Sequence, residues 1–243
     1  MELPDLPSES NFVGVTVYKN KVRIWGSGNQ LECHQSDPIE VMPKWEQCAG
    51  LPPGMDDAKV IQVLDDAWLF KNISIHVVPQ TGNASEIKRP HDKFHPGMCV
   101  QTNGISTVFI SISSGDVYIN TDATSPESWE CLATLPSRDM LVYHVCLLME
   151  SSLYVIGGYN GQGPLYKESY VIDIESGNVK RLGDLLIGKY DIAMAVINGA
   201  PAVICDFLKG KTEILDIATG TWRASDVGLL PITTPETVSF AIN

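Results

Sequence analysis

Two histidines four residues apart are the feature of this sequence that looks most like a metal site. His91 and His95 enclose Asp-Lys-Phe, and on a helix this spacing would place both imidazoles on one face, within reach of one ion. Pro90 and Pro96 flank the segment, however, and proline interrupts helices. We therefore expect a surface loop here and no metal site.

A glycine-rich stretch, GGYNGQG at 157–163, has the composition of a phosphate-binding loop. Such a loop needs a helix after its glycines, so that the amide dipoles converge on the anion. The segment that follows, Tyr166–Ile174, has the pattern of a strand instead. We expect Gly157 and Gly158 to end a strand, where the missing side chains let the backbone turn sharply and a neighbouring strand approach.

Motifs of common catalytic chemistry are absent from the sequence. There is no G-x-S-x-G nucleophile elbow, no P-loop and no H-E-x-x-H zinc motif. The acidic pairs Asp56-Asp57 and Asp65-Asp66 fall at predicted turns, where aspartate favours local backbone hydrogen bonds. His144 lies inside an apolar run, which places it in the core or along a channel. We predict a protein that is not an enzyme and needs no cofactor.

Cysteine usage bears on the compartment in which the protein works. Six cysteines stand at positions 33, 48, 99, 131, 146 and 205, and no two have C-x-x-C spacing. The N-terminal MELPDLPSES is acidic and lacks the apolar segment of a secretory signal. We therefore expect buried free thiols and a cytoplasmic location. The alternative is a secreted protein whose signal lies outside this chain; disulfides and the sequons at Asn72 and Asn83 would then matter.

Charge and hydropathy exclude two classes of partner. The chain has 243 residues, of which 44% are hydrophobic and 19% charged, as in folded globular proteins. Its net charge of −12 repels phosphate backbones, and no run of Lys and Arg offsets it, so we expect no nucleic-acid binding. The uncharged apolar stretch Ile192–Cys205 is too short to span a bilayer. It reads as two strands joined by a turn, and we expect no membrane association.

The chain repeats a sequence unit with a period of about 44 residues. YVIDIESGNVKR (170–181) and EILDIATGTWRA (213–224) share Asp-Ile-x-[Ser/Thr]-Gly, with Asp173 and Asp216 in matching places at an offset of 43. The segments KWEQCAGLPPG, SWECLATLPSRD and TWRASDVGLLP place Trp45, Trp129 and Trp222 at one repeat position. A catalytic residue is needed once, so the repetition predicts a structural role for the two aspartates.

Five repeats can be counted, starting near residues 12, 58, 98, 141 and 191, and each holds about four short apolar or alternating runs. No segment sustains a helical period for three turns. One four-stranded sheet cannot bury both of its faces, but neighbouring sheets stacked around an axis can. The pattern therefore predicts an all-β chain that forms a single β-propeller domain over residues 1–243. A β-solenoid is the structural alternative.

The repeats resemble those of the kelch family of β-propellers, and the chain is similar to a divergent member. Kelch repeats have a double glycine after the second strand, a Tyr on the third and a Trp at the start of the fourth. LYVIGG at 153–158, Tyr170 and Trp222 match those positions. The resemblance covers nearly the whole chain and is strongest in residues 129–231. Gly157-Gly158 is the only intact double glycine; repeat one has Gly26-Ser27 instead.

Kelch propellers commonly close with six blades, and this resemblance sets an expectation for the end of the chain. LLPITTPETVSFAIN repeats the link between blades, and the start of a further repeat falls at 237–243. We expect an incomplete six-bladed ring of which five blades are recognisable. A closed five-bladed ring is the alternative.

The resemblance implies a module that binds a protein or peptide through one rim of loops. That rim is formed by the loops between second and third strands together with the links between blades. Some kelch propellers serve ubiquitin ligases as substrate-recognition adaptors through a BTB domain, a role that would need an N-terminal part beyond this chain. A secreted kelch protein of unknown ligand and a galactose-oxidase-like enzyme are the alternatives. No set of Tyr and His copper ligands can be matched here.

Candidate contacts on this rim are the residue types that dominate protein interfaces, because Arg and Tyr supply large contact area and hydrogen bonds. These candidates are Arg89, Arg138, Tyr159, Asn160, Tyr166, Lys189 and Tyr190.

Overall fold

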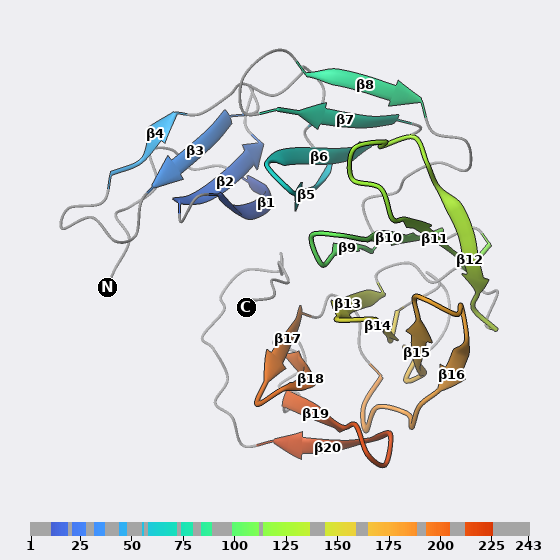
Figure 1. Ribbon diagram of the computed structural model, residues 1–243. Helices are drawn as coiled ribbons and strands as arrows, with labels where there is room; N and C mark the ends of the chain where they lie inside the picture. Colours follow the sequence, from blue (N-terminus) through green and yellow to red (C-terminus); the bar gives the residue numbers. More distant parts are fainter. Residues whose placement is uncertain are drawn as a thin grey trace. The chain divides into compact units, whose positions relative to one another are not determined.

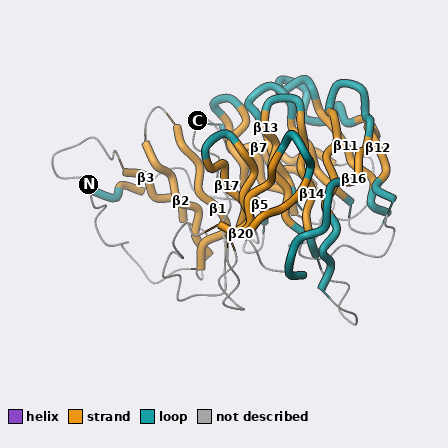
Figure 2. Tube along the Cα trace, turned by 90° about the horizontal axis from the view of Figure 1, so that it is seen from below, coloured by secondary structure: helices purple, strands orange, loops and turns teal. Residues whose placement is uncertain are grey.

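The protein consists of strands and loops throughout the part described by its computed structural model, with no helix among those residues (Figure 2). The described residues are 11–18, 21–27, 32–36, 44–47, 55, 58–71, 74–79, 84–88, 99–111, 114–136, 144–158, 165–188, 193–204 and 212–225.

Within the described residues, twenty strands form five four-stranded antiparallel sheets, which are the blades of a β-propeller fold (Figure 1). In each blade the strands are ordered across the sheet as they are along the chain. Blades 1 and 2 comprise β1 (Asn11–Tyr18), β2 (Lys21–Ser27), β3 (Glu32–Ser36), β4 (Glu46–Gln47), β5 (Lys59–Val63), β6 (Asp66–Lys71), β7 (Ser74–Val78) and β8 (Ser85–Lys88). Blades 3 to 5 comprise β9 (Val100–Thr102), β10 (Thr107–Ile110), β11 (Asp116–Asn120), β12 (Glu130–Thr134), β13 (Val145–Met149), β14 (Ser152–Ile156), β15 (Ser169–Asp173), β16 (Val179–Arg181), β17 (Ala193–Ile197), β18 (Ala200–Ile204), β19 (Thr212–Asp216) and β20 (Thr221–Ser225).

The five predicted repeats correspond to the five blades. Their first strands begin at residues 11, 59, 100, 145 and 193, each within a few positions of the predicted start. Repeats two and three, which lack a double glycine, also form complete blades. Residues 237–243 lie outside the described part of the chain, so the incomplete six-bladed ring stays a prediction.

The chain divides into two compact units, and the single-domain interpretation therefore stays a prediction. The first unit contains blades 1 and 2, and the second contains blades 4 and 5. Residues of blade 3 belong to both units. The first unit is Met1–Pro96, Gly104–Thr107 and Asn120–Trp129; the second is Gly97–Asn103, Val108–Ile119 and Glu130–Asn243.

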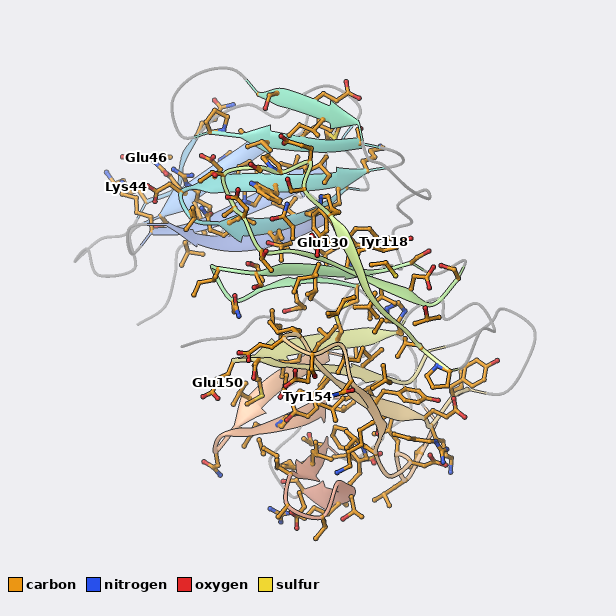
Figure 3. All side chains as sticks on the ribbon, turned by 45° about the vertical axis from the view of Figure 1, so that its right-hand side comes forward. Lys44, Glu46, Tyr118, Glu130, Glu150 and Tyr154 are labelled. Carbon is orange, nitrogen blue, oxygen red and sulfur yellow. A yellow bond between two sulfur atoms is a disulfide. The ribbon has the colours of Figure 1, made fainter. Side chains whose placement is uncertain are left out.

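Alternation along the strands of blade 4 explains the core of the second unit. Cys146 and Leu148 of β13 belong to one buried cluster, which also contains strands of blade 3. Their neighbours Val145 and Leu147 belong to another, which contains strands of blade 5. Tyr154 on β14, labelled in Figure 3, is buried in that second cluster. Because successive side chains of a strand point to opposite faces, blade 4 is apolar on both sides and packs between its neighbours.

The repeated Asp-Ile-x-[Ser/Thr]-Gly motif forms the turn between the third and fourth strands of its blade. Asp173 ends β15, and its Oδ1 accepts hydrogen bonds from the backbone N–H and the hydroxyl of Ser176, both at 2.7 Å. These bonds lower the pKa of Asp173. Asp216 ends β19 and accepts bonds from Ala218 N–H at 3.0 Å and Thr219 N–H at 3.2 Å. The predicted structural role of both aspartates is confirmed.

The glycine of the same motif is required by its backbone conformation and by its close packing. Gly177 has φ +72°, and a Cβ at this position would lie 2.5 Å from the carbonyl oxygen of Leu132 on β12 of the preceding blade. Gly220 is the equivalent glycine in blade 5 and has φ +70°. Its carbonyl oxygen accepts a 2.7 Å hydrogen bond from the N–H of Gly183, which follows the last strand of blade 4. Each of these turns therefore packs against the outer edge of the blade before it.

The three repeat tryptophans lie at the start of their fourth strands, as predicted. Trp222 on β20 donates its indole N–H to Ser169 Oγ of blade 4 at 2.9 Å. Trp129 precedes β12 and packs in the first unit, with its ring centroid 6.4 Å from Trp68 and 6.1 Å from Phe70. Trp45 directly precedes β4 and is half-buried. Both Trp129 and Trp222 thus contact the blade that precedes their own.

The remaining repeat positions also occupy the places that the pattern gave them. Gly26 lies at the end of β2, and Gly157 and Gly158 follow the last residue of β14 with φ +64° and +116°. β15 comes next rather than a helix, so this stretch has no phosphate-loop geometry. Tyr170 lies on β15 and is buried, with its hydroxyl 3.1 Å from Glu168 Oε2.

The expectation of free thiols is wrong for two of the six cysteines. Cys99 and Cys146 form a disulfide, with their Cα atoms 5.8 Å apart. Cys99 directly precedes β9 and Cys146 lies on β13, which are the first strands of successive blades. Their separation of 47 residues is close to one repeat, so equivalent positions of neighbouring blades meet. Cys131 is free but exposed rather than buried.

Candidate interaction surface at the link between blades 4 and 5

The chain between β16 and β17 forms a link whose described part is Leu182–Gly188. Three of its hydrogen bonds fix the backbone at Leu185 and Leu186. Leu185 N–H donates to the carbonyl of Lys167 at 2.8 Å, and Leu186 N–H donates to Glu213 Oε2 at 2.7 Å. Lys167 Nζ donates to the carbonyl of Leu186 at 2.9 Å. Both backbone groups of Leu186 are therefore fixed by side chains from other strands or loops.

Glu213 is unusual among these residues, because it carries a carboxylate and is only 1% exposed. It lies on β19, opposite Val203 and Ala224 of the neighbouring strands. A carboxylate that accepts a backbone N–H forms a charge-assisted bond, which is stronger than a neutral one. Burying a carboxylate costs free energy. Here the buried carboxylate of Glu213 positions the backbone of the link.

Three consecutive apolar residues of the link point in different directions. Leu185 is buried in the cluster shared by blades 4 and 5. Leu186 and Ile187 are 51% and 49% exposed. Large apolar side chains are normally expected to leave water, but single exposed ones are common. Two adjacent ones on a backbone held by three hydrogen bonds form a small, ordered apolar surface, which we call the link surface (Leu186 and Ile187).

The link also contacts the base of the loop after β14. A Cβ on Gly188 would lie 2.5 Å from the carbonyl oxygen of Leu165, so the two backbones touch closely. Tyr166 N–H donates to the carbonyl of Gly158 at 3.1 Å and closes the base of that loop. The described end of the link therefore lies beside the described base of the loop between β14 and β15.

Charged side chains pair near the start of the link. Arg181 at the end of β16 binds Asp184 Oδ1 at 2.6 Å and lies 3.8 Å from Glu168 Oε1. Burial raises the pKa of Tyr170, and its hydrogen bond to Glu168 raises it further. The ion pairs of Arg181 with Asp184 and Glu168 are partly exposed to solvent, so they contribute little to stability. Lys167 reaches the link surface itself, through its bond to the carbonyl of Leu186.

Most of the predicted contacts cannot be placed, and one can. Tyr166 is described; it is half-buried and packs against the cluster between blades 3 and 4, so much of its ring is not available to a partner. The other six candidates lie outside the described residues: Arg89, Arg138, Tyr159, Asn160, Lys189 and Tyr190. These six stay predictions.

Sequence reasoning missed the residues that form the link surface. The segment Gly183–Gly188 reads GDLLIG, an apolar run too short for a strand and enclosed by glycines. That pattern was a usable signal for an exposed apolar link. The role of Glu213 had no local signal, because its partner Leu186 is 27 residues away.

Glu213→Ala is expected to lower the free energy of unfolding by about 1–3 kcal/mol, because Leu186 N–H loses its acceptor. Glu213→Gln keeps a carbonyl oxygen and is expected to lose clearly less. Chemical denaturation of both variants checks the comparison. Equal losses would show that the hydrogen bond to Leu186 is not what makes Glu213 matter.

Metal and membrane features complete the description. Among the described residues, no three His, Cys, Asp or Glu side chains gather in a group able to hold a metal ion. His91 and His95 lie outside that part of the chain. His144 is buried, as the sequence predicted. None of the described segments forms a helix long and apolar enough to cross a membrane.

Comparison with known proteins identifies the fold. No protein-family model matches the chain, and no curated protein matches it. The solved structure of YjhT, a propeller protein, is similar to it with a TM-score of 0.66 and 13% sequence identity. The similarity covers 83% of this chain and 74% of that one. At this level of identity the likeness shows the β-propeller fold alone.

Proposed function

We propose that this protein is a non-enzymatic interaction module that binds a protein or peptide through the link surface and the rim around it. The observation that carries the proposal is the pair Leu186 and Ile187, about half exposed on a backbone held by Glu213 and Lys167. A rigid apolar group loses little conformational entropy when it binds. A charged border that excludes water from an apolar centre is the usual anatomy of an interface hot spot.

The kelch-type assignment belongs to the same proposal. It is supported by Gly157 and Gly158 directly after the second strand, Tyr170 on the third and Trp222 on the fourth. It is also supported by the close contact of Gly188 with Leu165, which unites the two loop types of a binding rim. The apolar side chains of a partner peptide would pack against Leu186 and Ile187.

A disulfide favours the secreted alternative over a cytoplasmic adaptor. Disulfides persist in oxidising compartments and are rare where glutathione and thioredoxin keep thiols reduced. The bond between Cys99 and Cys146 is buried in the second unit, as expected of a structural link rather than a catalytic one. We therefore propose that the binding module works outside the reducing cytosol.

Replacing Leu186 and Ile187 together with serine is expected to weaken binding of the partner at least tenfold, because each apolar contact contributes about 1.5–3 kcal/mol when fully buried. The measurement is quantitative capture of partners from the source organism, followed by affinity measurement on those identified. Folding should be unchanged, since both side chains are exposed.

Ile217→Ser is the matched control, because Ile217 is also an exposed apolar residue but lies in the turn after β19. Partners that depend on the link surface should be retained by this control and lost by the double variant. If both variants capture the same partners at the same affinity, binding through the link surface is ruled out.

A further inference from the structure

A leucine occupies a turn position that sequence normally gives to glycine or asparagine. Leu64 joins β5 to β6 and has φ +51°. Side chains other than Gly, Asn and Asp are disfavoured in this left-handed region. Leu64 is also 59% exposed, so its side chain makes little contribution to the core. Gln62 Nε2 fixes the turn by donating to the carbonyl of Leu64 at 2.8 Å. The position thus holds a large apolar group outward at a cost in stability.

The corresponding turn of the next blade shows the same exposure. Ile105 lies between β9 and β10, and at 74% it is the most exposed of the large apolar side chains that the structure describes. It follows Gly104, which has φ +88°. In a propeller fold the turns between first and second strands lie at one end of the blades. The segment Gly104–Thr107 belongs to the same compact unit as Leu64.

At this end, the turn segments of blades 2 and 3 carry only negative charge, whereas the corresponding segments of blade 1 contain Lys21 and Lys44. Residues 64–66, 104–107 and 120–129 contain Asp65, Asp66, Asp122 and Glu127 and have no Lys or Arg. Burial raises the pKa of Asp66, and the neighbouring Asp65 carboxylate raises it further. A cation placed beside this pair would relieve the repulsion between them.

We propose that these turns form a second docking surface, the turn surface (Leu64, Asp65, Asp66 and Ile105). Its partner is a protein segment that presents apolar side chains next to Lys or Arg. The apolar side chains of such a segment would cover Leu64 and Ile105, and its cations would pair with Asp65 and Asp66. Complementary charge speeds association and rejects acidic competitors. The link surface plays no part in this proposal.

Charge argues against two other occupants. A second copy of this chain also carries a net charge of −12, and the two acidic surfaces would repel. An anionic membrane surface would repel Asp65 and Asp66 for the same reason. A cationic amphipathic segment is the occupant that satisfies both the apolar and the acidic residues.

The test uses two fluorescein-labelled peptides, one of alternating Leu and Lys and one of alternating Leu and Glu, in fluorescence polarisation with the whole chain. We expect the Lys peptide to bind and the Glu peptide not to bind. Leu64→Gly is expected to weaken binding of the Lys peptide about tenfold. This variant should melt no lower than the native protein, because glycine suits φ +51°. A loss of binding therefore cannot be attributed to unfolding.

Charge is tested separately. The double variant Asp65→Asn and Asp66→Asn is expected to weaken binding and to flatten its dependence on salt. Its control is Glu175→Gln combined with Asp184→Asn, which removes two exposed carboxylates of blade 4 and should bind the Lys peptide as the native protein does. Equal binding of both peptides, or binding by Leu64→Gly and the Asp variant within about twofold of native, would overturn the proposal.

Discussion

Replacing Cys99 and Cys146 with alanine is expected to lower the free energy of unfolding by about 2–4 kcal/mol. The disulfide closes a loop between residues 47 positions apart, and releasing it gives the unfolded chain more conformations. Both side chains are buried between blades 3 and 4. Thermal and chemical unfolding, with and without reductant, measure the loss.

Two further measurements decide whether the disulfide is responsible for the expected loss of unfolding free energy. Cys131→Ala should change the unfolding free energy by less than about 0.5 kcal/mol, because this thiol is free and exposed. The native chain has six cysteines, so unfolding without reductant should release at most four titratable thiols. Six thiols in protein from its native source would contradict the bond and the proposed compartment together.

Gly177→Ala is expected to lower the free energy of unfolding by about 2–5 kcal/mol, since two separate penalties meet at this position. The φ of +72° is unfavourable for alanine, and the new Cβ would lie 2.5 Å from the backbone carbonyl oxygen of Leu132. Backbone cannot move aside as a flexible side chain can. Chemical denaturation of purified variants gives the value.

Gly199→Ala separates those two penalties. Gly199 has φ +76°, but a Cβ there meets nothing within 4 Å. This variant should lose only about 1–2 kcal/mol, which is the conformational part. The difference between the two variants then measures how tightly the turn of blade 4 packs on blade 3. Equal losses would mean that the close approach at Gly177 is relaxed at little cost.

Sequence alone predicted the blades well because their signals are local. In blade 4 the runs 143–149 and 152–157 correspond to β13 (Val145–Met149) and β14 (Ser152–Ile156). β14 ends one residue before this second apolar run does, because Gly157 leaves the strand with φ +64°. Alternation of Val, Ile, Leu and Tyr sets the strands, and Asp and Gly set the turns between them.

Features that depend on distant partners were predicted poorly. The bond between Cys99 and Cys146 was missed, although a spacing of about one repeat places both at equivalent positions of neighbouring blades. Leu186 and Ile187 were missed because rim candidates were chosen by residue type, with preference for Arg and Tyr. Leu64 was missed because alternation describes strands and says nothing of which side chain a turn exposes. In each case the decisive fact was the three-dimensional neighbour.

The contacts between blades 3, 4 and 5 have a direction along the chain. Gly177 packs on Leu132, Gly220 accepts a bond from Gly183, and Trp222 binds Ser169. In each pair the later residue belongs to the later blade and rests on an edge that precedes it in the sequence. During synthesis the N-terminal residues emerge first. When one of these blades leaves the ribosome, the residues on which it packs have therefore already been synthesised. The second unit is thus suited to assembly one blade at a time during translation.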